Sequence, residues 1–123
     1  MSKSPKSTYR KGREAEEMAV AWLESKGWTI LDRNYSFMRA EVDVVAYDQK
    51  CIVFVEVRSL ADTKFGYPEE TIGREKEKQI YKAAEAWMYE RKMEGSPARF
   101  DVVSIVQKEN EAPSIQHFEN AFQ

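Results

Sequence analysis

The sequence contains few of the residues that small proteins use for covalent or metal cross-links. Its 123 residues include one cysteine, Cys51, and one histidine, His117. No Cys-x-x-Cys motif is present, and a lone thiol in an apolar run is typical of a small buried side chain in a reducing compartment. A chain of this length buries roughly two-thirds of its unfolded surface, so it can fold without a disulfide or a structural metal.

Long apolar runs and a strong excess of one charge are also missing. No stretch approaches the roughly 20 apolar residues that a membrane-spanning helix requires. The first residues, MSKSPKSTYRKGR, are basic but lack the apolar segment of a signal peptide. We therefore expect a cytoplasmic protein without a membrane partner. The net charge of −2 argues against a basic coat over the whole surface, although local basic patches are present.

The pattern of apolar residues predicts one domain behind a short arm. Residues 1–10 contain Ser, Pro and Lys and few apolar side chains, so we expect a flexible basic arm there and a single domain over residues 11–123. Apolar residues at helical spacing predict helices over residues 11–26 and 72–93. Runs rich in β-branched residues predict strands over residues 28–35, 41–47, 51–57 and 100–106, and SIQHFENAF adds a last edge strand.

The resulting order, α-β-β-β-α-β-(β), predicts the fold class. A hairpin followed by a helical crossover places antiparallel and parallel neighbours in one sheet. We therefore expect an α/β sandwich in which helices flank a mixed central β-sheet.

Charged side chains interrupt the hairpin that should fill the core. The stretch AEVDVVAYDQKCIVFVEVRS, residues 40–59, carries Glu41, Asp43 and Glu56, followed by Arg58. Because strand side chains alternate between faces, Glu41 shares a face with Asp43, and Glu56 shares one with Arg58. We interpret Glu41 as a rim residue, whereas Asp43 lies between two valines and needs a partner.

The length of the turn decides whether Asp43 meets Glu56. A four-residue connection over residues 48–51 would pair Tyr47 with Ile52 and set the two acids opposite each other, whereas an odd-length turn would separate them. Opposed carboxylates repel each other and cost stability. A divalent cation such as Mg²⁺, which takes oxygen ligands and commonly uses one or two carboxylates, would remove that repulsion. The nearby arginine could instead act alone, or the acids could be a solvated strand end.

Two groups of basic residues are candidate contacts to nucleic acid. Arg10, Lys11 and Arg13 lie near the start of the chain, and Arg74 and Lys78 lie at the start of the second predicted helix. Contacts of such residues with phosphates are independent of base sequence and sensitive to salt. The alternative is a solubilising tail and a solvated helix face.

An ordered set of motifs resembles a known family. It comprises GREAEEMAVAWLESKGWTILDRNY, RAEVDVVAYD, VFVEVRS, FGYPEETIGREKEKQIYKAAEAW, RFDVVSI and NAF, which together cover most of residues 10–123. These motifs resemble the YraN-like family of small bacterial proteins, which are predicted endonucleases. That family is similar to the archaeal Holliday-junction resolvases and to the wider PD-(D/E)xK nuclease fold. The resemblance therefore implies a restriction-endonuclease-like sandwich.

The resemblance also implies a metal site. Carried over position by position, its acids are Glu14 in the first helix, Asp43 within AEVD, and Glu56 as the glutamate of an E-x-K motif. Mg²⁺ or Mn²⁺ would bind Asp43, Glu56 and the main-chain carbonyl of Val57, with Glu14 bound directly or through water. Taken alone, Glu14 could equally serve to favour the positive end of its helix.

The chain departs from the family pattern at two positions. Ala40 replaces a glycine, and Arg58 replaces the lysine of E-x-K. That lysine is expected to orient the attacking water and to stabilise the developing charge. Arginine stabilises charge and binds phosphate in a bidentate fork, but it cannot accept a proton near neutrality. Lys76, in the second predicted helix, also matches a family lysine and is a candidate replacement.

Three hypotheses about function follow. The first is a Mg²⁺- or Mn²⁺-dependent endonuclease that acts on DNA phosphodiesters, including branched DNA. The second is a nucleic-acid-binding module that Arg58 has made weak or inactive, and the third is a protein-interaction scaffold. A resolvase-like activity would favour a two-fold homodimer, since two symmetric cuts need two sites. The segment Phe65-Gly66-Tyr67 is either a lid over the carboxylates or a plain turn.

Overall fold

The computed structural model describes residues 5–60 and 73–122, with side chains from residue 13 onward. The elements follow the expected order: α1 (Pro5–Ser25), β1 (Thr29–Phe37), β2 (Ala40–Tyr47), β3 (Ile52–Leu60), α2 (Arg74–Glu90), β4 (Ala98–Val106) and β5 (Ser114–Phe118). None of the described helices is long and apolar enough to cross a membrane.

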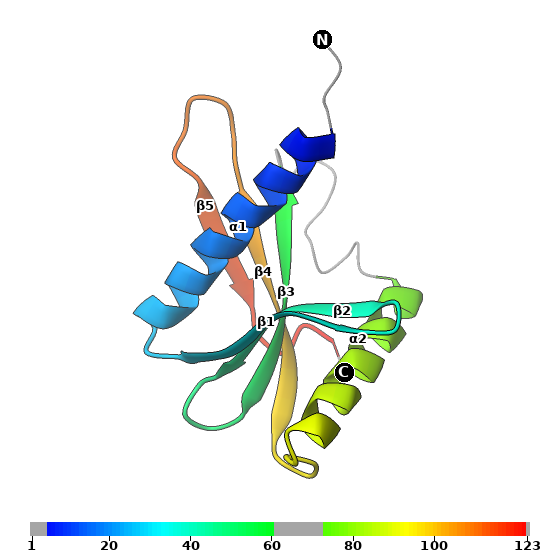
Figure 1. Cartoon of the computed structure of the whole chain (residues 1–123). Coiled ribbons are helices and arrows are strands. Elements are labelled where there is room, and N and C mark those ends of the chain that lie inside the picture. The colour runs from blue at the N-terminus through cyan, green and yellow to red at the C-terminus, as the bar shows by residue number, and fades with distance from the viewer. Residues whose placement is uncertain (1–4, 61–72, 123) are drawn as a thin grey trace.

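The five strands form one mixed sheet in the order β1-β2-β3-β4-β5 (Figure 1). Strands β3 and β4 are parallel, and every other neighbouring pair is antiparallel. The parallel pair flanks α2 in the chain, as a helical crossover requires. The predicted α/β fold class with a mixed central sheet is confirmed.

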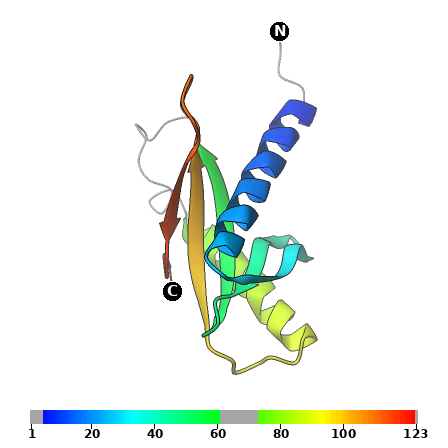
Figure 2. The same ribbon diagram turned by 90° about the vertical axis from the view of Figure 1, so that its left-hand side faces the viewer.

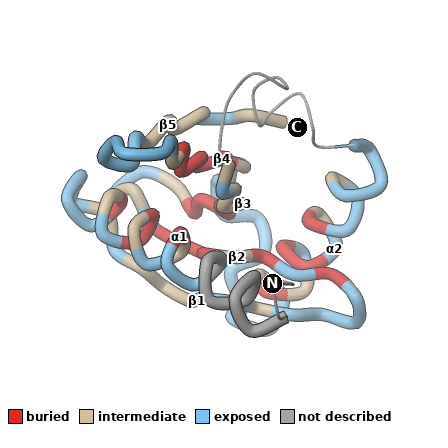
Figure 3. The backbone as a smooth tube through the Cα atoms, turned by 90° about the horizontal axis from the view of Figure 1, so that it is seen from above, coloured by how far each residue is buried: buried red, intermediate tan, exposed pale blue. Residues whose placement is uncertain are grey.

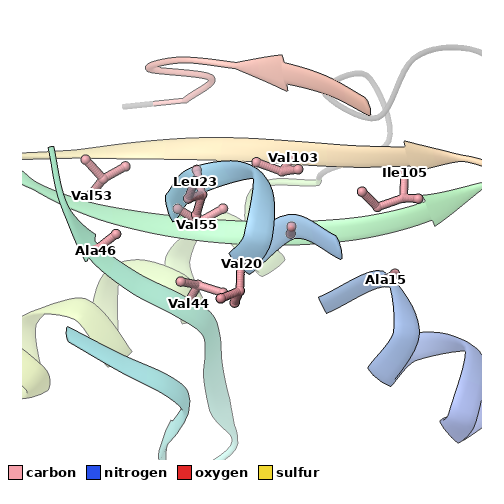
Figure 4. Close-up of a cluster of buried hydrophobic side chains, with 10 residues drawn as sticks. Ala15, Val20, Leu23, Val44, Ala46, Val53, Val55, Val103 and Ile105 are labelled. Atoms are coloured by element: carbon pink, nitrogen blue, oxygen red, sulfur yellow. The ribbon is translucent and has the colours of Figure 1, made fainter. Parts of the chain in front are cut away.

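Helix α1 covers one face of the sheet. Its apolar stripe and the inward side chains of β2, β3 and β4 form a buried cluster (Figure 4): Ala15, Ala19, Val20, Leu23, Val44, Ala46, Val53, Val55, Val103 and Ile105. Burying one valine or leucine side chain fully contributes roughly 1.5–3 kcal/mol. This cluster therefore fixes α1, and the acids it carries, against the centre of the sheet.

Helix α2 covers the opposite face. Its buried residues meet β2 and β3 in a second cluster: Ala40, Val42, Val45, Ile52, Phe54, Ile80, Ala83, Ala84 and Trp87. Buried segments of both helices turn toward the strands between them (Figure 3). The start of α2 is thereby held beside the strands that carry the hairpin acids.

Strand β2 contributes to both apolar layers within a few residues. Val42 packs in the cluster under α2, whereas Val44 packs in the cluster under α1. Side chains two residues apart normally share a face, so the strand twists sharply between them. The β1–β2 hairpin accordingly projects sideways from the long β3–β4 pair (Figure 2). Asp43 lies at this twist.

Several predicted boundaries differ from the structure by one or more residues, including those of α1, α2 and β3. Helix α1 begins at Pro5 and not at the predicted residue 11, so residues 5–10 belong to a helix. Proline suits the first helical position, where its missing N–H costs nothing. The flexible arm over residues 1–10 stays a prediction. Residues 1–4 lie outside the described part. Helix α2 ends at Glu90, before the predicted end at residue 93. Strand β3 runs on to Leu60, which places Arg58 within a strand.

A buried charged network ties the far end of the sheet together. Arg99 on β4 pairs with Asp101 on the same strand and with Asp48 in the β2–β3 turn. Nε2 of His117, on β5, lies 2.8 Å from Oδ2 of Asp101. The backbone N–H of Asn120 donates to the same carboxylate. The only histidine thus has a structural position at the sheet edge.

Candidate active site

The β2–β3 turn has the length that brings the two hairpin acids together. Tyr47 pairs with Ile52, as predicted for a four-residue connection, and the pairing continues to Val44 opposite Val55. The side chain of Asp48 stabilises this turn, because its Oδ1 accepts the N–H groups of residues 50 and 51. Asp43 and Glu56 are the next residues along the two strands after this last pair.

Asp43 occupies the place where β2 separates from β3. The backbone N–H of Val57 lies beyond the last ladder pair and donates to Oδ2 of Asp43 over 2.8 Å. The side chain thus replaces a ladder bond that the twist of β2 removes. The same carboxyl group hydrogen-bonds to the carboxyl of Glu56, which is only 6% exposed.

This arrangement changes the acidity of Asp43. Burial and the negative charge of Glu56 raise the pKa of Asp43 to about 8, against the smaller opposing effect of the Val57 N–H bond. A hydrogen bond between two carboxyl groups requires a proton on one of them. The pair therefore holds a proton at neutral pH that a cation could replace.

Lys76 supplies a positive charge to this pair. It lies in the first turn of α2, and its Nζ is 3.1 Å from Oε2 of Glu56. The Lys76 side chain is 49% exposed, so the ammonium group joins the buried acid to the surface. The predicted replacement lysine therefore contacts the glutamate of the E-x-K motif.

Arg58 lies further along β3 and is half-buried. In the parallel register it pairs with Ser104 of β4. The hydroxyl of Ser104 is buried and has no hydrogen-bond partner within the described part of the chain. No sequence pattern selects Ser104, because a serine in an apolar strand has no distinguishing feature.

The two acids of the first helix, Glu14 and Glu16, differ in burial. Glu14 is exposed on α1, whereas Glu16 is partly buried and its charge adds to the rise in the pKa of Asp43. Glu16 also lies 3.7 Å from Nη2 of Arg33. Helical geometry offered a signal for it, since Glu16 lies one turn before the buried Val20.

The predicted phosphate contacts are only partly described. Arg13, Arg74 and Lys78 are exposed. The side chains of Arg10 and Lys11, and the predicted lid at residues 65–67, lie outside the described part of the chain. Lys76 contacts the Glu56 carboxylate directly.

Two carboxyl groups, not three, converge at the site. Within residues 13–60 and 73–122, no group of three or more histidine, cysteine, aspartate or glutamate side chains is arranged to hold a metal ion. Mg²⁺ is nevertheless commonly bound by one or two carboxylates, with water and substrate phosphates completing its shell. The oxygen donors of Asp43 and Glu56 fit that chemistry.

Comparison with known proteins identifies the family. A family model described as "Uncharacterised protein family UPF0102" matches residues 15–105. The chain belongs to the UPF0102 family. The matched region contains both hairpin acids, Arg58 and Lys76, whereas Glu14 precedes it.

UPF0102 relatives match the chain over nearly its whole length. A UPF0102 protein of Persephonella marina is 42% identical over 112 residues, which cover 91% of this chain and 92% of the relative. Those of Anaeromyxobacter dehalogenans and Geotalea daltonii are 43% and 39% identical, covering 90% of this chain and 82% and 87% of their own lengths. The resemblance to YraN-like proteins is thus confirmed as family membership, and the names of these relatives state no activity.

Proposed function

We propose that this UPF0102 protein is a metal-dependent endonuclease that acts on DNA phosphodiesters. The contact between the partly buried carboxyl group of Asp43 and the buried one of Glu56 is the observation that carries the proposal. Such a pair costs stability unless a proton or a cation lies between its members. An arrangement that costs stability and lies beside an exposed lysine is more typical of an active site than of a structural core.

Asp43, Glu56 and the carbonyl of Val57 are the proposed ligands of Mg²⁺ or Mn²⁺. When bound, the cation would polarise a phosphodiester oxygen and lower the pKa of a coordinated water. The chain prepares these ligands in two ways. The Val57 N–H holds the Asp43 carboxyl in a fixed orientation, and the α1 and α2 clusters hold the two strands that carry the acids. Glu14 is the weaker ligand candidate because it is exposed.

Lys76 is the proposed source of positive charge for the reacting phosphate. Its ammonium group is already beside Glu56 and half-exposed, so it can turn toward a phosphate without leaving the site. Stabilising negative charge as it develops is commonly the largest contribution to such catalysis. A lysine can also exchange a proton, which Arg58 cannot do. In this proposal Arg58 positions phosphate, and Lys76 performs the role of the motif lysine.

The proposed substrate contacts are the exposed cations on either side of the acids. Arg13 on α1 and Arg74 and Lys78 on α2 would bind phosphates, with Arg10 and Lys11 extending the first group. Contacts of this kind hold the sugar-phosphate backbone of DNA and do not depend on base sequence. DNA binding should therefore weaken steeply as salt is raised.

The test is cleavage of supercoiled, linear and four-way DNA by the purified protein in Mg²⁺ and in Mn²⁺. We expect cleavage by the wild type, loss of it in Asp43→Asn, and a decrease of at least about 100-fold in Lys76→Met, the effect of removing one group that stabilises the transition state. Glu109→Gln and Lys108→Met, both exposed in the β4–β5 loop, are the matched controls and should cleave normally.

Two results would contradict the proposal. If neither the wild type nor Arg58→Lys cuts any substrate in Mn²⁺, the enzyme hypothesis fails. If Arg58→Lys cuts and the wild type only binds, the chain is a nucleic-acid-binding module. Cleavage that persists in Asp43→Asn would indicate a contaminating nuclease.

A further inference from the structure

The tip of the β1–β2 hairpin carries an apolar side chain where polar residues or glycine are usual. Met38 occupies the two-residue turn with a φ of 56°, in the left-handed region. Among the described non-glycine residues with positive φ, it alone is apolar; the others are asparagine, glutamine or lysine. Its side chain is 88% exposed, so it packs little within its own chain. Folding of one chain therefore does not explain a methionine here.

A groove of about 760 Å³ lies between this tip and the outer face of α2. Phe37, Met38, Ala86 and Tyr89 give it an apolar lining, and Tyr89 is 69% exposed. An exposed methionine beside exposed aromatic side chains is typical of a protein interface. The groove is therefore a candidate docking surface.

The charges around the groove indicate what it binds. Its lining includes three acids and one base: Glu85, Glu90, Glu94 and Lys82. An acidic rim repels nucleic acid and favours an apolar partner that carries a basic residue. The hairpin tip has this composition, because the exposed Arg39 follows Met38 directly.

We propose that this surface binds a second copy of the chain through a two-fold interface. Met38 of each copy enters the groove of the other, and Arg39 meets the acidic rim. A two-fold interface uses the same patch on both copies, and here the tip and the groove adjoin, so both contacts form together. The proposal is independent of the endonuclease activity, since no residue of the carboxyl site lines the groove.

Sedimentation equilibrium of the full chain over a range of concentrations tests the proposal. We expect a monomer–dimer equilibrium in the wild type. Two charge variants are compared: the single variant Arg39→Glu, and the double variant with Glu90→Lys and Glu94→Lys. Each should weaken self-association at least about tenfold, because each places like charges opposite one another. An equimolar mixture of these two variants should form heterodimers more readily than either forms homodimers. Lys108→Glu makes a similar charge change on an exposed loop and should dimerise like the wild type.

Met38→Gly separates an interface role from a folding role. Glycine suits the left-handed backbone, so this variant should keep or gain thermal stability while losing self-association. A wild type that stays monomeric, or a dimer that none of these variants weakens, would overturn the proposal. A mixture of the charge variants that gains no heterodimer would exclude the pairing of Arg39 with the rim.

Discussion

Lys76 on α2 and Glu56 on β3 form an ion pair of 3.1 Å between two consecutive elements, which residues 61–73 separate in the chain. The contact joins the start of a helix to the middle of the sheet, next to the carboxyl group of Asp43. In the proposed site, this lysine from a helix would perform the role that the E-x-K motif assigns to a residue of the strand. The first prediction tests this pair.

Lys76 and Glu56 should be energetically coupled. Exposed ion pairs contribute about 0.2–1 kcal/mol, and this pair should lie at the upper end because Glu56 is buried. A double-mutant cycle with Lys76→Met and Glu56→Gln, measured by urea unfolding, should give a coupling free energy near that limit. The same cycle with Lys78→Met, an exposed lysine on the same helix, should give none. Equal coupling in both cycles would contradict the contact.

The free energy of unfolding should depend on the ionisation of Asp43 between about pH 4 and pH 8. In the unfolded chain an aspartate ionises near pH 3.9. In the folded protein burial and Glu56 hold the pKa of Asp43 at about 8. The folded state therefore binds more protons between these values. The stability that Asp43 contributes is fully present below about pH 4 and is lost as the pH rises through about 8.

The substitution Asp43→Asn should remove the loss of stability that accompanies ionisation of Asp43. Without divalent cations, the variant should become more stable relative to the wild type between pH 5 and pH 9, by about 1 kcal/mol or more. Urea unfolding in EDTA at several pH values measures the difference, with Glu109→Gln as the control. A constant difference across this range would show that Asp43 ionises normally.

The pH dependence of stability that Asp101 contributes should have the opposite sign to that of Asp43. Burial alone would raise the pKa of Asp101, but hydrogen bonds from His117, Arg99 and the Asn120 N–H lower it. Its contribution is therefore present above about pH 4 and is lost as the pH falls through the lowered pKa. Asp101→Asn should cost about 3 kcal/mol at pH 7. Thermal unfolding from pH 7 to pH 3 should show this cost shrinking; a pH-independent cost would indicate a purely steric role.

Much of the fold could be predicted because its signals are local. Val44, Val55 and Val103 belong to β-branched runs that predict strands. The length of the turn after Tyr47 stayed open in the sequence, and the structure decides it, and with it the register. The Asp43–Glu56 contact follows from that register. The start of α1 was predicted too late because serine and lysine near the start of a chain suggest disorder, although Pro5 favours a helical start.

Contacts between distant residues could not be predicted in the same way. The choice between Glu14 and Glu16 depends on the rotation of α1 about its axis, which the packing of Ala15 sets. The contact of His117 with Asp101 depends on β5 pairing with β4 as an edge strand. No local pattern specifies either arrangement.

Binding of Mn²⁺ by calorimetric titration tests the central claim most directly, because it requires neither a substrate nor turnover. The account predicts that one cation binds to the wild type and to Glu109→Gln, and that Asp43→Asn binds it at least about tenfold more weakly. Equal affinity in all three proteins, or no binding to any of them, would contradict a metal site built on Asp43 and Glu56.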